Sequence, residues 1–96
     1  MKITIMQSVK IQGEGVSHYW SKEYGDRFII PCKGDKIEDP LWKEPYEYEV
    51  IEVVISYDQD TCCVTVAPYE NEIPELRKGE FGKMADFHGW KASWLL

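Results

Sequence analysis

The sequence lacks the features that define several large classes of protein. It has no apolar run near the roughly 20 residues that cross a bilayer, and its N-terminus, MKITIMQSVK, lacks the continuous apolar segment of a signal peptide. It also has no strand–glycine loop–helix pattern for binding phosphate, and none of its serines lies in a nucleophile elbow. These absences predict a cytoplasmic protein that does not bind membranes, requires no cofactor and is not an enzyme.

Cysteine and histidine are too sparse and too scattered to predict a metal site. The adjacent Cys62 and Cys63 point to opposite faces of a strand, which disfavours both a shared metal and a disulfide between them. His18 and His88 have no second ligand at short spacing, although a zinc site with Cys32 or Cys63 is conceivable. We therefore predict packing roles and no bound metal, and keep a thiol- or metal-dependent enzyme as the least favoured alternative, with Cys63 as its reactive thiol.

The acidic residues are concentrated in the middle of the chain. The net charge is −6 over 96 residues, and residues 35–60 alone contribute two lysines and nine carboxylates, or −7. Such a surface repels phosphate backbones, so direct nucleic-acid binding is disfavoured, and it attracts a protein partner with a basic surface. The alternative is a solvated surface that only maintains solubility. The length predicts one domain, residues 1–96.

The first third of the chain predicts strands separated by glycine- and proline-rich loops. Apolar residues alternate with polar ones over residues 3–11, which predicts a half-buried strand. Residues 16–26 are aromatic and polar without a clear period, so we expect a loop there. Residues 27–31 predict a second short strand that ends at Pro31, followed by a turn in which Gly34 has a positive φ.

A β-hairpin is the strongest local prediction. Alternation in residues 46–57 changes phase after Val50, which indicates a β-bulge or sharp bend. The strand of residues 61–66 follows a polar turn that we place at residues 58–61. This turn predicts that Tyr57 faces Cys62 and that Ile55 faces Val64, with Cys62 on the core side.

The C-terminal third predicts little regular structure. A single helical turn is expected near residues 74–78, because proline is tolerated at the first helical position. The tail from residue 84 fits either a helix or a strand, and Gly89 favours a closing strand over residues 90–95. The fold class is therefore mainly β: a small, strongly bent antiparallel sheet or partly open five-stranded barrel, in a single domain with little helix.

The predicted binding site is the acidic, aromatic segment of residues 38–60. Exposed tyrosine and tryptophan beside carboxylates suit a protein interface, as in an accessory or inhibitor protein. They also suit an aromatic cage around a cationic peptide or small ligand, through cation–π contacts. The remaining alternative is that these rings only pack in the core. The candidate residues are Trp42, Glu44, Tyr46, Glu47, Tyr48 and Glu49.

Overall fold

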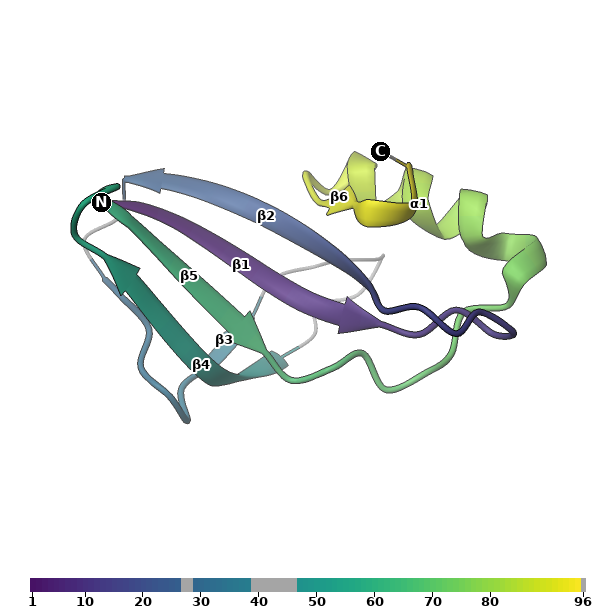
Figure 1. Cartoon of the computed structure of the whole chain (residues 1–96), viewed down its shortest axis with the longest axis horizontal. Helices are drawn as coiled ribbons and strands as arrows, with labels where there is room; N and C mark the ends of the chain where they lie inside the picture. Colours follow the sequence, from purple (N-terminus) through teal and green to yellow (C-terminus); the bar gives the residue numbers. More distant parts are fainter. Residues whose placement is uncertain (27–28, 39–46, 96) are drawn as a thin grey trace.

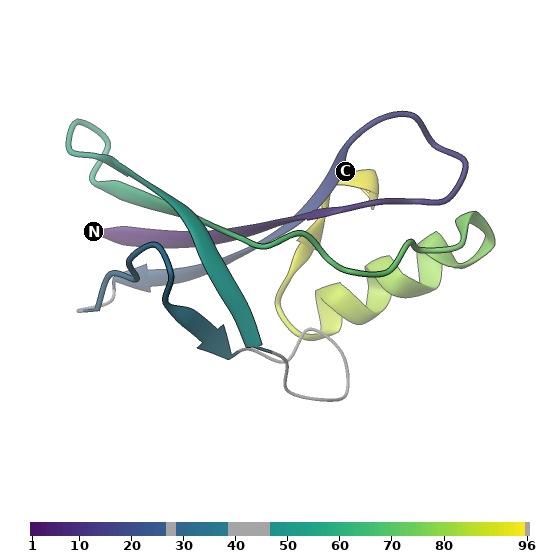
Figure 2. The ribbon, with the colours of Figure 1, turned by 90° about the horizontal axis from the view of Figure 1, so that it is seen from below.

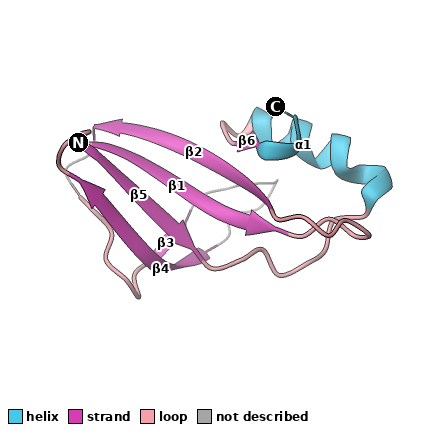
Figure 3. Ribbon diagram, in the orientation of Figure 1, coloured by secondary structure: helices cyan, strands magenta, loops and turns pink. Residues whose placement is uncertain are grey.

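One twisted sheet of six strands organises the protein, in the order β3-β4-β5-β1-β2-β6 (Figure 1). The computed structural model describes residues 1–26, 29–38 and 47–95. The strands are β1 (Lys2–Val9), β2 (His18–Asp26), β3 (Lys36–Glu38), β4 (Glu47–Ser56), β5 (Thr61–Val66) and β6 (Lys91–Ala92). The helical elements are η1 (Glu75–Arg77), α1 (Lys78–Phe87) and η2 (Ser93–Leu95), which gather at one end (Figure 3).

The mainly β fold with an open sheet and little helix is confirmed. The sheet has six strands where the sequence indicated about five, and β1 and β5 pair in parallel within an otherwise antiparallel arrangement. β5 pairs with β1 on the side away from β2, and its hairpin partner β4 lies outside β5.

The alternation in β1 defines the two faces of the sheet. Its odd-numbered residues, Ile3, Ile5, Gln7 and Val9, are buried on what we call the core face. Pairing places Cys62 and Val64 of β5 beside Ile3 and Ile5 on this face. The even-numbered residues of β1 lie on the reverse face, where they are half-buried or exposed. Figure 2 shows α1 on one side of β1 and β2, and the core includes Ala85 of this helix.

The loop expected at residues 16–26 is wrong, because β2 occupies most of that segment. β2 pairs with β1 from Val9↔His18 to Lys2↔Asp26. Its alternation is hidden in the sequence because the register shifts between Ile3 and Thr4, which leaves Tyr24 as an extra residue, and only Trp20 is fully buried. The strand expected at residues 27–31 is not found at residues 29–31, and residues 27–28 lie outside the described part.

The β4–β5 hairpin forms with the predicted bulge and a different register. Val50 pairs with Val66 and Glu52 with Thr65, so Ile51 is the extra residue at the predicted change of phase. The four-residue turn begins one position earlier than expected, at residue 57, and ends on Asp60, whose φ is 54°. Aspartate is one of the few residues that tolerate this conformation.

The earlier turn shifts the partner of each core residue. Cys62 pairs with Ile55, where the sequence predicted Tyr57. Val64 pairs with Val53, where the sequence predicted Ile55. Tyr57 lies in the turn and is 86% exposed. The prediction that Cys62 lies on the core side is nevertheless correct. The observed register differs from the predicted one by two residues, and a shift of two leaves each side chain on the same face of the sheet.

The C-terminal region contains more helix than expected. α1 continues from η1 through Gly79 and Gly82 to Phe87. Gly82 is buried, so a small residue suits this position. The helix ends in a Schellman motif: Gly89 has a φ of 86°, its N–H donates to the Asp86 carbonyl at 2.9 Å, and the Trp90 N–H donates to the Ala85 carbonyl at 2.8 Å. The closing strand is therefore limited to Lys91–Ala92.

Candidate functional site

The predicted site residues that the structure describes are two exposed carboxylates and one buried ring. Glu47 and Glu49 of β4 are exposed, whereas Tyr48 between them is 3% exposed and belongs to the core. Strand alternation causes this division, because Tyr48 shares the core face with Val50. The Tyr48 ring therefore packs in the core, as the packing alternative predicted, and does not anchor a surface. Trp42, Glu44 and Tyr46 lie outside the described residues.

Carboxylates from two adjacent strands meet on the reverse face at one edge of the sheet. β3 pairs with β4 so that Glu38 lies directly opposite Glu47, and Lys36 lies opposite Glu49. Glu52 follows on the same face, since it pairs with Thr65 of β5. We call the carboxylates Glu38, Glu47, Glu49 and Glu52 the acidic face. Like charges directly opposite each other in a sheet repel, so Glu38 and Glu47 favour a cation between them.

The acidic face lacks internal neutralisation in the part of the chain that is described. None of its four carboxylates forms an ion pair with a described residue, and Lys36 makes no such contact with Glu49. Carboxylates elsewhere do find partners, such as Glu23, which lies 3.2 Å from Lys2 Nζ. Among the described residues, Lys36 is the one cation that strand pairing places directly opposite one of these carboxylates.

A surface hollow adjoins the acidic face. It has a volume of about 280 Å³, and its lining includes Glu47, Glu49, Glu70 and Lys36. Tyr48 and Gln7 form part of its floor, since both are buried. Glu70 comes from the segment after β5 and adds a carboxylate that the sequence did not associate with this site. The lining therefore combines three acidic residues with one cation, Lys36.

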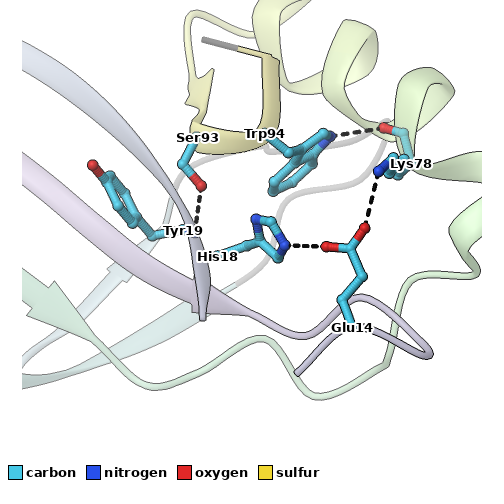
Figure 4. A network of polar contacts seen from close by, with 6 residues as sticks. All are labelled: Glu14, His18, Tyr19, Lys78, Ser93 and Trp94. Carbon is cyan, nitrogen blue, oxygen red and sulfur yellow. Dashed lines mark hydrogen bonds and ion pairs between the residues drawn. The ribbon is translucent and has the colours of Figure 1, made fainter. Parts of the chain in front are cut away.

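A second group of polar side chains ties three distant segments together (Figure 4). Glu14 of the β1–β2 loop accepts a hydrogen bond from His18 Nε2 and another from Lys78 Nζ at 2.9 Å. Trp94 Nε1 donates to the Lys78 carbonyl at 2.9 Å, and the Trp94 ring meets His18 edge-on at a centroid distance of 5.8 Å. The Tyr19 N–H donates to Ser93 Oγ at 3.0 Å.

This group fixes the loop and the C-terminus to the start of α1. Hydrogen bonds from Lys78 and then His18 lower the pKa of the Glu14 carboxyl. A carboxylate held this way is a weak base, so the arrangement is better suited to structure than to proton transfer. An open hollow of about 360 Å³ lies beside Glu14 and His18. No residue pattern predicted this contact, although Glu14 and His18 are only four residues apart in the chain.

The two adjacent cysteines lie in the environments that the sequence predicted. Cys62 is buried on the core face, and Cys63 is half-buried on the reverse face, where its thiol donates to Met6 Sδ at 3.3 Å. Burial raises the pKa of the Cys63 thiol, and the neighbouring Cys62 and Glu52 raise it further. The reactive thiolate is therefore a minor species at neutral pH, which weakens the alternative of a thiol enzyme.

No group of three or more histidine, cysteine or carboxylate side chains among the described residues is arranged to hold a metal ion. Within the same residues, no helix is long and apolar enough to cross a membrane. Comparison of the chain with protein-family models, with curated proteins and with solved structures finds no match.

Proposed function

We propose that the chain is a non-enzymatic binding domain, of accessory or inhibitor type, whose acidic face contacts a protein partner with a basic surface. The observation that carries this proposal is the position of Glu38 directly opposite Glu47, beside the exposed Glu49. Cross-strand repulsion between two carboxylates disfavours the free state, and a lysine or arginine of the partner would relieve it.

The hollow beside the acidic face supports a specific mode of contact. Glu47, Glu49 and Glu70, together with Lys36, line a space of about 280 Å³, which has room for one long cationic side chain. Arginine fits best, because its planar guanidinium can bind two carboxylate oxygens at once. The alternative aromatic cage loses one of its predicted walls, because the Tyr48 ring belongs to the core.

The proposal is tested by recovering partners with the immobilised full chain and comparing matched charge variants. The variant Glu47→Lys/Glu49→Lys is expected to lose a partner that the unmodified chain retains. The control Glu72→Lys/Asp86→Lys makes the same change of charge at exposed positions outside the acidic face. Both variants must have the circular dichroism spectrum of the unmodified chain.

Two outcomes would contradict the proposal. If both variants lose the partner equally, the attraction depends only on net charge and not on the acidic face. If neither loses it, another surface binds. Binding through the acidic face should also weaken as salt is raised, because screening acts over about 10 Å at 0.1 M salt.

A further inference from the structure

The outer edge of β4 beyond Val50 is open in the described structure. β3 pairs only with Glu47–Glu49, and the main chain of Val50 is bonded to Gly34 and Asp35 at 2.8 Å each. No described residue forms a backbone hydrogen bond on the outer side of residues 51–56. Six residues of this ten-residue strand therefore have no strand paired on their outer side in the described part of the chain.

The directions of the free backbone groups follow from the neighbouring strands. The Lys2 N–H donates to the Asp60 carbonyl at 3.1 Å. Backbone groups alternate in direction along a strand, so the N–H and C=O groups of even-numbered β5 residues point to β1, and those of odd-numbered residues point to β4. These odd-numbered residues pair with Glu52, Val54 and Ser56. The N–H and C=O groups that point out of the sheet are therefore those of Val53 and Ile55.

This edge lacks the charged residues that usually protect a free strand. Glu52 is its only charge, whereas Val54 is 53% exposed and Ile55 is 40% exposed. The opposite edge of the sheet is different: beyond Ser21, which pairs with β6, β2 carries the charged residues Lys22, Glu23 and Asp26. Natural proteins use such charges to prevent strands from pairing at their edges. The β4 edge is therefore suited to a partner strand.

We infer that the partner strand is β4 of a second copy of this chain. When two copies pair antiparallel with Val54 opposite Val54, Val53 of each copy lies opposite Ile55 of the other. Each Val53–Ile55 pair can exchange two backbone hydrogen bonds. The two symmetric pairs therefore give four. It also places Glu52 opposite Ser56 and Tyr57 opposite Ile51, so within residues 51–57 no charge lies directly opposite a like charge.

Neighbouring registers are less favourable for stated reasons. Centring the pair on Ile55 brings Glu52 opposite Asp58 of the second copy, which sets two carboxylates against each other. Centring it on Val53 moves Ile55 opposite the bulged residue Ile51. The self-pairing centred on Val54 joins the two sheets into one, and Glu38, Glu47 and Glu49 of each copy lie outside the paired segment.

The mass in solution tests this inference. Sedimentation equilibrium of the full chain should give a species of twice the 11.2 kDa chain mass that dissociates on dilution. Val54→Lys places two lysines opposite each other at the centre and should give the single-chain mass. Val16→Lys, the same substitution at a 66% exposed loop residue, should remain dimeric.

The register is tested by a cysteine at the centre of the pair. In a non-hydrogen-bonded antiparallel pair the Cα atoms lie about 4.5 Å apart, within the range of a disulfide. Cys32 and Cys63 are first replaced by serine, because Cys63 lies directly across from Val54 in the same chain. In that background, Val54→Cys should form a disulfide-linked dimer under mild oxidation, and Glu52→Cys should not.

Each outcome decides the inference. A single-chain mass for the unmodified protein at all concentrations overturns it, and so does a dimer that persists in Val54→Lys. Faster crosslinking of Glu52→Cys than of Val54→Cys overturns the register. If Val54→Lys misfolds, the two cysteine variants still decide the question. A monomer whose partner binding still depends on Glu47 and Glu49 would overturn the dimer while leaving the proposed function intact.

Discussion

The hydrogen bonds of Gln7 hold the β4–β5 hairpin to the rest of the core, and their loss has a predictable cost. Gln7 is 1% exposed and is the only buried polar or charged residue in the described structure. Its Oε1 accepts from Trp20 Nε1 at 2.8 Å, and its Nε2 donates to the Ala67 carbonyl at 2.8 Å. One side chain therefore joins β1, β2 and the end of β5.

Gln7→Leu keeps the size of the side chain and removes both bonds. Each buried group that loses its partner costs about 1–3 kcal/mol, or about 4 kcal/mol for the pair. Burying the more apolar leucine returns roughly 2 kcal/mol. The net loss should be about 2 kcal/mol, a large part of the roughly 5–15 kcal/mol that stabilises a small domain.

Urea unfolding followed by circular dichroism measures this loss. With a slope of about 1–3 kcal/mol/M, the midpoint should fall by about 1 M. Gln12→Leu makes the same substitution at an exposed position and should leave the midpoint almost unchanged. A second test uses Trp20→Phe, which removes the indole N–H: in that background Gln7→Leu should cost less, with a coupling of at least about 0.5 kcal/mol.

If Gln7→Leu were as stable as the unmodified chain, these two hydrogen bonds would not stabilise the fold. If the cost were the same with and without the Trp20 indole, the two side chains would be energetically independent.

Two further predictions concern the helix and its attachments. Because the pKa of Glu14 is lowered in the folded state, its stabilising effect is present above the ordinary carboxyl pKa and is lost as the pH falls through the lowered value. Glu14→Gln should thus be less stable than the unmodified chain at neutral pH, and the two stabilities should become equal in acid. The control Glu70→Gln should be as stable as the unmodified chain at each pH. Urea unfolding across this pH range measures both. Gly89→Ala should lose about 1–2 kcal/mol, because Gly89 has a φ of 86° and an added Cβ would lie 3.4 Å from Lys22 Cε. Gly15→Ala is its control, since a Cβ there meets nothing within 4 Å, and equal thermal midpoints for the two variants would contradict this account.

Local patterns in the sequence predicted those parts of the fold that depend on one strand and its neighbour. The alternation around Ile5 and the change of phase at Val50 both reflect a single buried face, so β1 and the bulge in β4 could be placed correctly. β2 could not, because its interior contains a bulge at Tyr24 and only one fully buried residue. Its strand conformation depends on pairing with β1, which is not a local property.

The position of the helix and the composition of the candidate site could not be predicted from residue patterns, because both depend on tertiary packing and strand pairing. Gly82 disfavours a helix in isolation, yet it is buried in α1, where the absence of a side chain suits close packing. Glu38 and Glu70 join Glu47 only through the pairing of β3 with β4 and the path of the chain after β5. Exposure of Glu47 and Glu49 could be inferred from alternation, and the same rule could have placed Tyr48 in the core.

The most direct test of the account is a nuclear magnetic resonance titration of the full, isotope-labelled chain with a short arginine-rich peptide. The largest amide shift changes should fall on residues 36–38 and 47–52. Glu47→Lys/Glu49→Lys should abolish them, and Glu72→Lys/Asp86→Lys should not. Shift changes centred on the hollow beside Glu14 and His18, or spread evenly over all exposed carboxylates, would contradict binding at the acidic face.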